Sequence, residues 1–194
     1  MNSINSSKIV AIGGGPASGK SYFYELLKRS NRLPEEYILH DPDLVMQSLP
    51  EYEIDSQNDL ASAFARWEKP ALQLANILLR NALLARNNIV YLRTLALPDS
   101  LAFLREARSL GYEIETHLLI CDKELAISRA IEREQIINRH LSIETLLERH
   151  EAVNTLLNDI KNASNQFYLY ENNINGAEPI LLEFGSQEIQ MIVD

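Results

Sequence analysis

The chain has little of what would mark a secreted, membrane-bound or nucleic-acid-binding protein. Its one cysteine, Cys121, excludes a disulfide within the chain, which fits a reducing compartment. Eighteen Lys and Arg against 27 Asp and Glu give a net charge of −9, which argues against general nucleic-acid binding. No apolar run approaches the roughly 20 residues of a membrane span, and the polar N-terminus carries no signal peptide. We therefore expect a cytoplasmic protein, or one delivered by a route that leaves no such N-terminal mark, and no membrane binding.

Metal-ligand and hydrolase patterns are also missing. The four histidines show no ligand spacing with Cys121, so no zinc site is predicted, and no serine-hydrolase elbow is present. The hydrophobic content of 46% is ordinary for a globular protein. We expect one domain over residues 1–194, which is long enough to bury a sizeable core.

Strand-like and helix-like segments alternate along the chain. This order predicts an α/β fold, a three-layer sandwich with a mostly parallel sheet of about five strands and helices on both faces. Pro70 should kink or break the long helix. Strands are expected over residues 8–13, 37–40, 88–92, 112–121, 166–170 and 179–184; helices are expected over 18–30, 60–86, 99–110, 123–135 and 142–163.

The most specific motif follows the first strand. The stretch GGPASGKS matches G-x-x-x-x-G-K-S, a phosphate-binding loop between a strand and a helix. Its backbone N–H groups and the helix N-terminus should cradle phosphates of ATP or GTP. Lys20 should reach the β- and γ-phosphates, and Ser21 should hold Mg²⁺. The predicted cofactor-binding residues are Gly14, Gly15, Pro16, Ala17, Ser18, Gly19, Lys20, Ser21 and Tyr22.

Two carboxylates, Asp41 and Asp43, follow the second predicted strand. At the carboxyl end of a parallel strand, either could accept a proton from a substrate hydroxyl. Either could also anchor a water bound to Mg²⁺. Helix capping is the alternative, because Asp before Pro is a common helix start. The residues alone leave these readings open.

Arginines form a second candidate group: Arg129, Arg133 and Arg139. The first two are four residues apart on a predicted helix and therefore share one face. Arginines that reach over a transferring phosphoryl group would stabilise its charge. Surface pairing with Glu132 and Glu134 is the alternative.

Several segments together resemble the zeta-toxin family of small kinases over residues 8–173. DPDLVMQSLPEY resembles the family segment that places a catalytic Asp after strand two, and the matching residue is Asp43. YLRTL resembles the strand-three segment with its E-x-T pattern. AISRAIER matches the family's R-x-x-x-R lid helix, and LERH resembles a later segment with a phosphate- or substrate-facing arginine.

The resemblance implies roles for particular residues. Lys20, Asp43, Arg129 and Arg133 would be catalytic, within a P-loop kinase-like fold whose helical lid spans about residues 123–150. The substrate-binding residues that it implies, with the neighbouring candidates, are Asp41, Arg93, Thr94, Arg139 and Arg149.

Three positions depart from the family pattern: its Asn is Asp41 here, an Arg is Met46, and a Glu is Leu92, with Arg93 beside it. Arg93 in place of a carboxylate would favour a more anionic acceptor. The resemblance implies an ATP·Mg²⁺-dependent kinase that phosphorylates a hydroxyl of a small acceptor, such as UDP-N-acetylglucosamine, and a separate antitoxin or inhibitor protein. The alternatives are a nucleoside, polynucleotide or antibiotic kinase, or a nucleotide-binding regulatory protein with impaired catalysis.

Overall fold

The computed structural model describes residues 7–137 and 141–186. One sheet of six strands, in the order β2-β3-β1-β4-β5-β6, forms its centre. The pairs from β2 to β5 are parallel and β6 is antiparallel to β5. The strands are β1 (Lys8–Gly14), β2 (Ile38–His40), β3 (Ile89–Leu92), β4 (Glu113–Ile120), β5 (Gln166–Glu171) and β6 (Ile180–Ser186).

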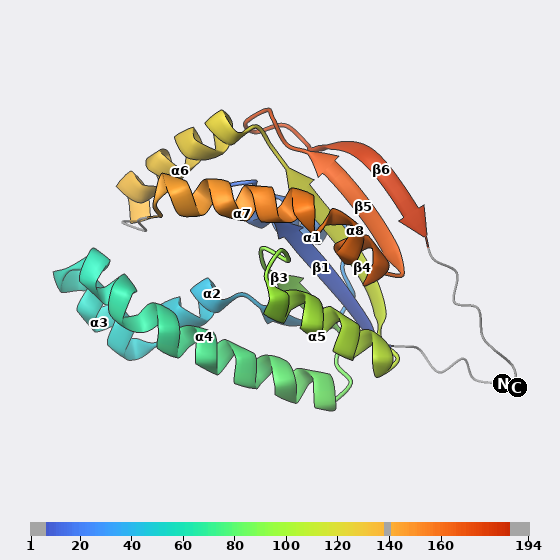
Figure 1. Cartoon of the computed structure of the whole chain (residues 1–194). Coiled ribbons are helices and arrows are strands. Elements are labelled where there is room, and N and C mark those ends of the chain that lie inside the picture. Colours follow the sequence, from blue (N-terminus) through green and yellow to red (C-terminus); the bar gives the residue numbers. More distant parts are fainter. Residues whose placement is uncertain (1–6, 138–140, 187–194) are drawn as a thin grey trace, which may run out of the picture.

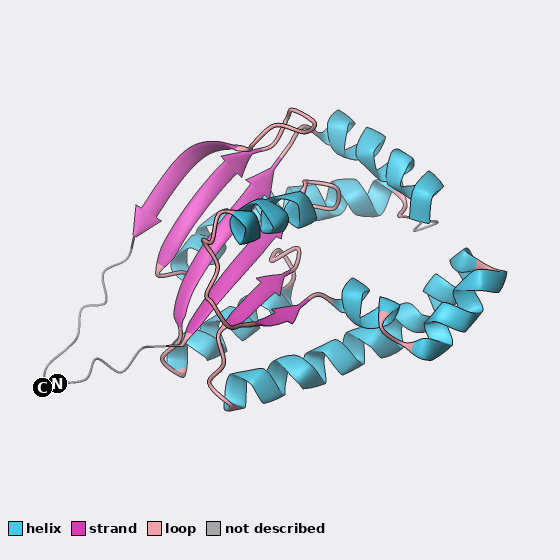
Figure 2. Cartoon of the chain, turned by 180° about the vertical axis from the view of Figure 1, so that it is seen from behind, coloured by secondary structure: helices cyan, strands magenta, loops and turns pink. Residues whose placement is uncertain are grey.

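Helices cover both faces of this sheet (Figures 1 and 2), as the alternating pattern predicts. One face packs against α4, α5, α7 and α8 in the larger apolar cluster, and the other packs against α1. The helices are α1 (Lys20–Arg29), α2 (Pro42–Gln47), α3 (Pro50–Asn58), α4 (Leu60–Leu84), α5 (Pro98–Ser109), α6 (Lys123–Ile137), α7 (Ile143–Thr155) and α8 (Leu157–Asn162).

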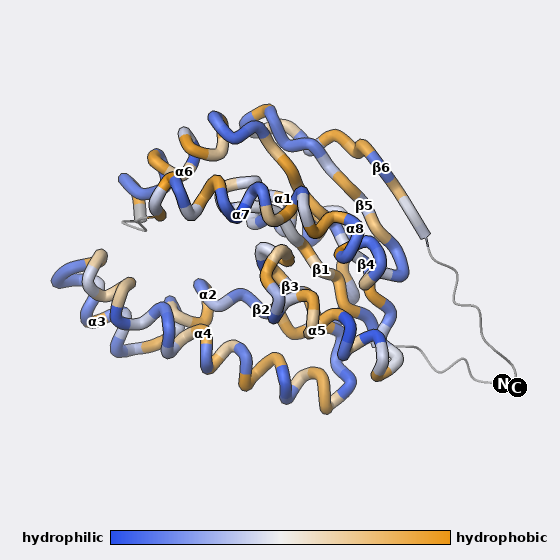
Figure 3. The backbone as a smooth tube through the Cα atoms, viewed as in Figure 1, coloured by the Kyte–Doolittle hydropathy of each residue, from blue (hydrophilic) through white to orange (hydrophobic). Residues whose placement is uncertain are grey.

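After Lys8, the central strand β1 carries only apolar residues (Figure 3), and both of its faces are buried. Its side chains alternate, so Ile9 and Ala11 enter the α4–α5–α7–α8 cluster, whereas Val10 and Ile12 enter the α1 cluster. Burial on both sides fixes the position of the loop that follows Gly14.

The helices differ from expectation in three places. The helix α4 runs through Pro70 without the break that was one of the two expected outcomes, since this proline lies on the exposed side where a freed carbonyl can be hydrated. The helix predicted over residues 142–163 is two helices, because Leu156 leaves helical geometry (φ −95°, ψ 10°) although no glycine or proline marks the place. The helices α2 and α3 are not among the predicted elements, although each begins with proline at its first position.

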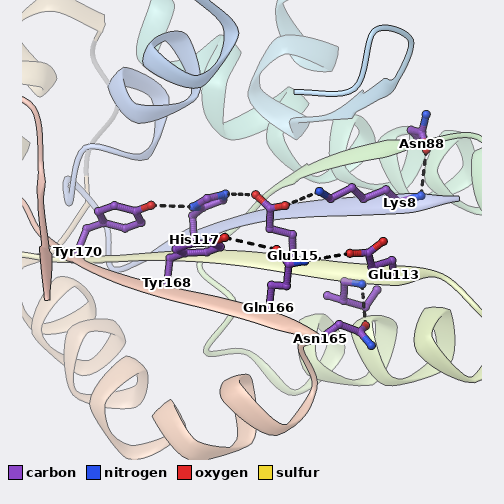
Figure 4. A network of polar contacts seen from close by, with 10 residues as sticks. Lys8, Asn88, Glu113, Glu115, His117, Asn165, Gln166, Tyr168 and Tyr170 are labelled. Carbon is purple, nitrogen blue, oxygen red and sulfur yellow. Dashed lines mark hydrogen bonds and ion pairs between the residues drawn. The ribbon is translucent and has the colours of Figure 1, made fainter. Parts of the chain in front are cut away.

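A buried polar chain joins three strands beneath α1 (Figure 4). Lys8 of β1 forms an ion pair with Glu115 of β4, and Glu115 Oε1 lies 2.7 Å from Nε2 of His117. Burial acts to raise the pKa of Glu115, but bonds from His117 and Lys8 outweigh it and lower the pKa to about 2. A carboxylate only accepts, so Nε2 of His117 donates, and Nδ1 accepts from the Tyr170 hydroxyl at 3.2 Å. This series of polar contacts therefore joins β5 to β4 and β1.

A second buried histidine ends β2, next to the predicted catalytic segment. His40 is 3% exposed, and its ring stacks on Tyr91 with centroids 4.9 Å apart. Burial, followed by the positive charge of Arg93, lowers the pKa of His40 to about 4. The folded protein therefore holds this ring neutral well below the pH at which it would be protonated in the unfolded chain.

This difference predicts a loss of stability on acidification. With a folded pKa of about 4 and an unfolded pKa of 6.5, the stabilisation from His40 is present above pH 6.5 and is lost as pH falls toward 4. Between pH 7.5 and 5.5 it amounts to about 1.4 kcal/mol of unfolding free energy. His40→Phe keeps the stacking on Tyr91 but cannot titrate. Between pH 7.5 and 5.5 its unfolding free energy should therefore fall by about 1.4 kcal/mol less than that of wild type. Urea denaturation at both pH values measures it, and identical pH dependence in the two proteins would refute it.

Candidate active site

The loop between β1 and α1 has the geometry of an anion site. Gly14 and Gly19 have φ of 141° and 95°, and a Cβ on them would lie 2.4 Å from the Leu119 carbonyl oxygen and 2.1 Å from Nδ2 of Asn172, respectively. Both positions therefore require glycine. The helix α1 begins at Lys20 with no side chain capping its N-terminus, which leaves backbone N–H groups to bind an anion.

Lys20 bends back over this loop. Its Nζ donates to the carbonyl oxygens of Gly14 at 3.0 Å and Gly15 at 2.8 Å. These bonds place the ammonium group at the mouth of the loop, where a point charge would meet phosphate oxygens.

Side chains from two distant segments hold the outer surface of the loop. The Nδ2 group of Asn172, which directly follows β5, donates to the Ser18 carbonyl at 2.9 Å. From α7, Nε2 of His150 lies 2.9 Å from the Pro16 carbonyl oxygen. Both side chains are buried, so water cannot readily replace either bond.

The loop opens on a cavity of about 600 Å³ that brings most of the predicted residues together. Gly14, Gly15 and Ser18 are buried within the loop rather than part of the lining, and Arg139 lies outside the described residues. The predicted residues that line the cavity are Pro16, Ala17, Gly19, Lys20, Ser21, Tyr22, Asp41, Asp43, Arg93, Thr94, Arg129, Arg133 and Arg149.

The two carboxylates play different structural parts. Asp41 is the N-cap of α2, and its Oδ1 accepts from the N–H of Asp43 at 3.0 Å. Asp43 lies in the first turn of that helix, half-buried, and lines the same cavity as Lys20. The capping interpretation therefore describes Asp41, and both residues line the cavity.

Three arginines enter the cavity from the opposite side. Arg129 of α6 is held by the loop after β5, because Nε donates to Oδ1 of Asn175 at 2.7 Å and a terminal nitrogen donates to the Asn172 carbonyl at 3.0 Å. Arg133 follows one helical turn later, and Arg149 comes from α7. The loop that supports the phosphate-binding loop thus also positions Arg129.

The end of β3 supplies another part of the lining. Strand alternation predicts that Arg93 points away from Leu92 and Thr94 unless the chain bends, and β3 does end at Leu92, with a bend at Arg93. All three residues line the cavity. The Arg93 guanidinium also lies 3.6 Å from Oδ2 of Asp99, a mostly exposed carboxylate.

Sequence reasoning missed the wall that α4 contributes. Phe64, Glu68 and Leu72 line the cavity at intervals of four residues, so they form one stripe of this helix. That spacing was readable in the sequence, but only the position of α4 beside α2 shows which stripe faces the cavity. Trp67, one position away, instead donates from Nε1 to Asp55 of α3 at 2.8 Å.

A comparison with protein-family models identifies the family of this chain. The model of the family described as Zeta toxin matches residues 2–175. The chain belongs to the zeta toxin family. A sequence search of curated proteins found no match.

Solved structures show the same fold as this zeta toxin family member. The PezAT chromosomal toxin–antitoxin system of the human pathogen Streptococcus pneumoniae matches with a TM-score of 0.70 at 15% identity, over 94% of this chain and 73% of that one. The complex of AvrRxo1-ORF1 with ORF2 matches with a TM-score of 0.67 at 14% identity, over 95% of this chain and 62% of that one. A structure of that complex with ATP also has a TM-score of 0.67, at 14% identity, over 94% and 61% of the two chains.

The Asn172 support predicts a measurable effect on the loop. Asn172→Ala leaves the buried Ser18 carbonyl without its donor, which should lower the unfolding free energy by about 1–3 kcal/mol and weaken ATP binding. Chemical denaturation and titration calorimetry measure the two effects. Asn154→Ala, on the exposed side of α7, is the control and should change neither quantity. Wild-type ATP affinity in Asn172→Ala would contradict the proposed support.

Proposed function

We propose that this member of the zeta toxin family is an ATP-dependent kinase that phosphorylates a hydroxyl group of a small acceptor. One observation carries the proposal: a phosphate-binding loop with Lys20 at its mouth opens on the same cavity as the Asp43 carboxylate and three arginines. This arrangement suits phosphoryl transfer, in which catalysis comes mainly from positioning and charge stabilisation. The structure of the AvrRxo1-ORF1:ORF2 complex with ATP adds support for ATP as the donor.

The reaction assigns one task to each group. The acceptor hydroxyl oxygen attacks the γ-phosphorus, the bond to the β–γ bridging oxygen breaks, and ADP leaves. Asp43 takes the hydroxyl proton. Lys20, Arg129 and Arg133 neutralise charge on the phosphoryl oxygens during transfer, and Arg149 is placed to add to it. We propose that the segment of about residues 123–150 acts as the lid.

A magnesium ion fits the oxygen donors that line the cavity. The Ser21 hydroxyl is exposed at the cavity, one position after Lys20, and the Asp41 and Asp43 carboxylates line the same space. Mg²⁺ prefers oxygen ligands and usually binds through few protein groups together with substrate phosphates. The Ser21 hydroxyl and these carboxylates would hold the ion, whose positive charge would offset the negative charge of the phosphate groups.

The proposed function also includes a specific acceptor and a protein partner. UDP-N-acetylglucosamine is the first acceptor to test, because Arg93 and Thr94 line the cavity and their side chains suit an anionic acceptor with a sugar hydroxyl. We also propose a separate inhibitor protein, since the PezAT structure is described as a toxin–antitoxin system.

Transfer of label from γ-labelled ATP tests the function. The protein is incubated with Mg²⁺ and a panel of nucleotide sugars, nucleosides and small alcohols, and one labelled product should form. Lys20→Ala, which lacks the charge at the β- and γ-phosphates, should form none. Tight ATP binding without any labelled product would favour the regulatory alternative, for which Leu92 and Met46 in place of charged family residues are the sequence evidence.

The carboxylates should differ in kinetic importance. Asp43→Asn removes the proposed base but keeps the side-chain shape, so kcat should fall by about 10²-fold or more with ATP affinity retained. Asp41→Asn should cost much less, because asparagine caps a helix about as well as aspartate. Steady-state kinetics of both variants decide the ranking, and a larger loss in Asp41→Asn would move the base to Asp41.

Arg93 should govern acceptor binding rather than nucleotide binding. Arg93→Ala should raise the acceptor KM about tenfold or more, because a charge-assisted bond to an anionic group is lost, while the KM for ATP stays within about twofold. Asp99→Ala is the matched control: it removes the same ion pair but leaves the cavity cation in place. Its acceptor KM should stay at the wild-type value. A fall in melting temperature with unchanged kinetics in Arg93→Ala would assign the residue a structural role.

A further inference from the structure

His150 contacts the phosphate-binding loop from outside the cavity. It lies on the buried side of α7 together with Leu146 and Val153, and it is 6% exposed. Its Nε2 lies 2.9 Å from the Pro16 carbonyl oxygen, 134 residues earlier in the chain. A carbonyl only accepts, so Nε2 carries the proton and donates.

The ring also lies against Gly15. A Cβ built on Gly15 would lie 2.5 Å from Nε2 of His150 and 2.6 Å from two of its ring carbons. Gly15 is a variable position of the phosphate-loop motif, and its φ is not in the left-handed region. The close approach of His150 therefore accounts for glycine at this position, where the motif and the backbone conformation do not require it.

The bond sets the direction of one peptide group. Because a trans peptide is planar, a Pro16 carbonyl that points at His150 turns the N–H of Ala17 the opposite way. Ala17 lines the cavity and has a φ of 58°, which costs energy for a residue with a Cβ. Such a conformation persists only where neighbouring contacts hold it.

We propose that His150 is a positioning residue, which holds the Pro16–Ala17 peptide so that the Ala17 N–H is directed at a bound phosphate group. The residue next to it, Arg149, lines the cavity, so α7 contributes to the nucleotide site through one residue inside the cavity and one behind the loop. The inference rests on the proposed binding of ATP and adds a determinant of its affinity.

Nucleotide binding to His150→Leu and His150→Gln tests the donor. Leucine fills the space without a donor, and glutamine places an N–H near the position of Nε2. The dissociation constant for ATP should rise about tenfold in His150→Leu and stay within about threefold of wild type in His150→Gln. The dissociation constant for adenosine, which has no phosphate, should be the same in all three proteins. Equal ATP affinity in His150→Leu and wild type, or equal weakening for adenosine, would overturn the proposal.

Val153→Ala separates positioning from general damage to α7. Val153 is 2% exposed on the same side of the helix and packs in the core rather than on the loop. This variant should have a lower melting temperature than wild type but the same ATP affinity. An ATP affinity that falls with melting temperature in both Val153→Ala and His150→Leu would overturn the positioning role.

A second experiment needs no nucleotide and so separates this inference from the proposed function. Gly15→Ala should lower the melting temperature because its Cβ meets the His150 ring. In a protein that already carries His150→Ala, Gly15→Ala should lower it far less, because the ring is gone. Equal losses in the two backgrounds would refute the contact. Suppose that wild type fails to bind ATP while Gly15→Ala still lowers the melting temperature more in wild type than in His150→Ala. In that case the contact between Gly15 and His150 is confirmed, but its role in phosphate binding is refuted together with the proposed function.

Discussion

The site depends on the conformation of the loop between β1 and α1. A backbone that directs N–H groups at one point must direct its carbonyl groups elsewhere, and those carbonyls need donors. Lys20 supplies donors to Gly14 and Gly15, His150 to Pro16, and Asn172 to Ser18. The anion site is therefore built as much by the side chains that bind the loop carbonyls as by the loop itself.

The sequence predicts the parts of this site that are contiguous in the chain. It does not predict the contacts between residues far apart in the chain. The motif, its strand and its helix are contiguous, so the fold class and the positions of Lys20 and Ser21 follow from pattern and spacing. His150 and Asn172 lie 134 and 154 residues from their partners, and no periodicity connects them to the loop. The family resemblance includes the segment that contains His150 but does not indicate that this side chain binds a loop carbonyl.

Failures in the helical predictions have the same origin. Propensity places a kink or a break at Pro70, but α4 is not broken there: it packs against α2, α3 and the sheet, and tertiary packing outweighs one missing hydrogen bond. The same packing turns the stripe of Phe64, Glu68 and Leu72 toward the cavity. The end of the cavity that would hold the acceptor is thus formed by tertiary contacts, which explains why the sequence indicates a nucleotide more clearly than it indicates an acceptor.

Charge distribution gives the cavity a character opposite to that of the whole chain. The chain carries a net charge of −9, yet five cationic side chains line the cavity against three acidic ones, Asp41, Asp43 and Glu68. Arg129 donates two hydrogen bonds to the loop after β5, so this charge sits on a side chain that the fold positions. A cationic cavity in an acidic protein concentrates anionic ligands at one place and repels them elsewhere on the surface.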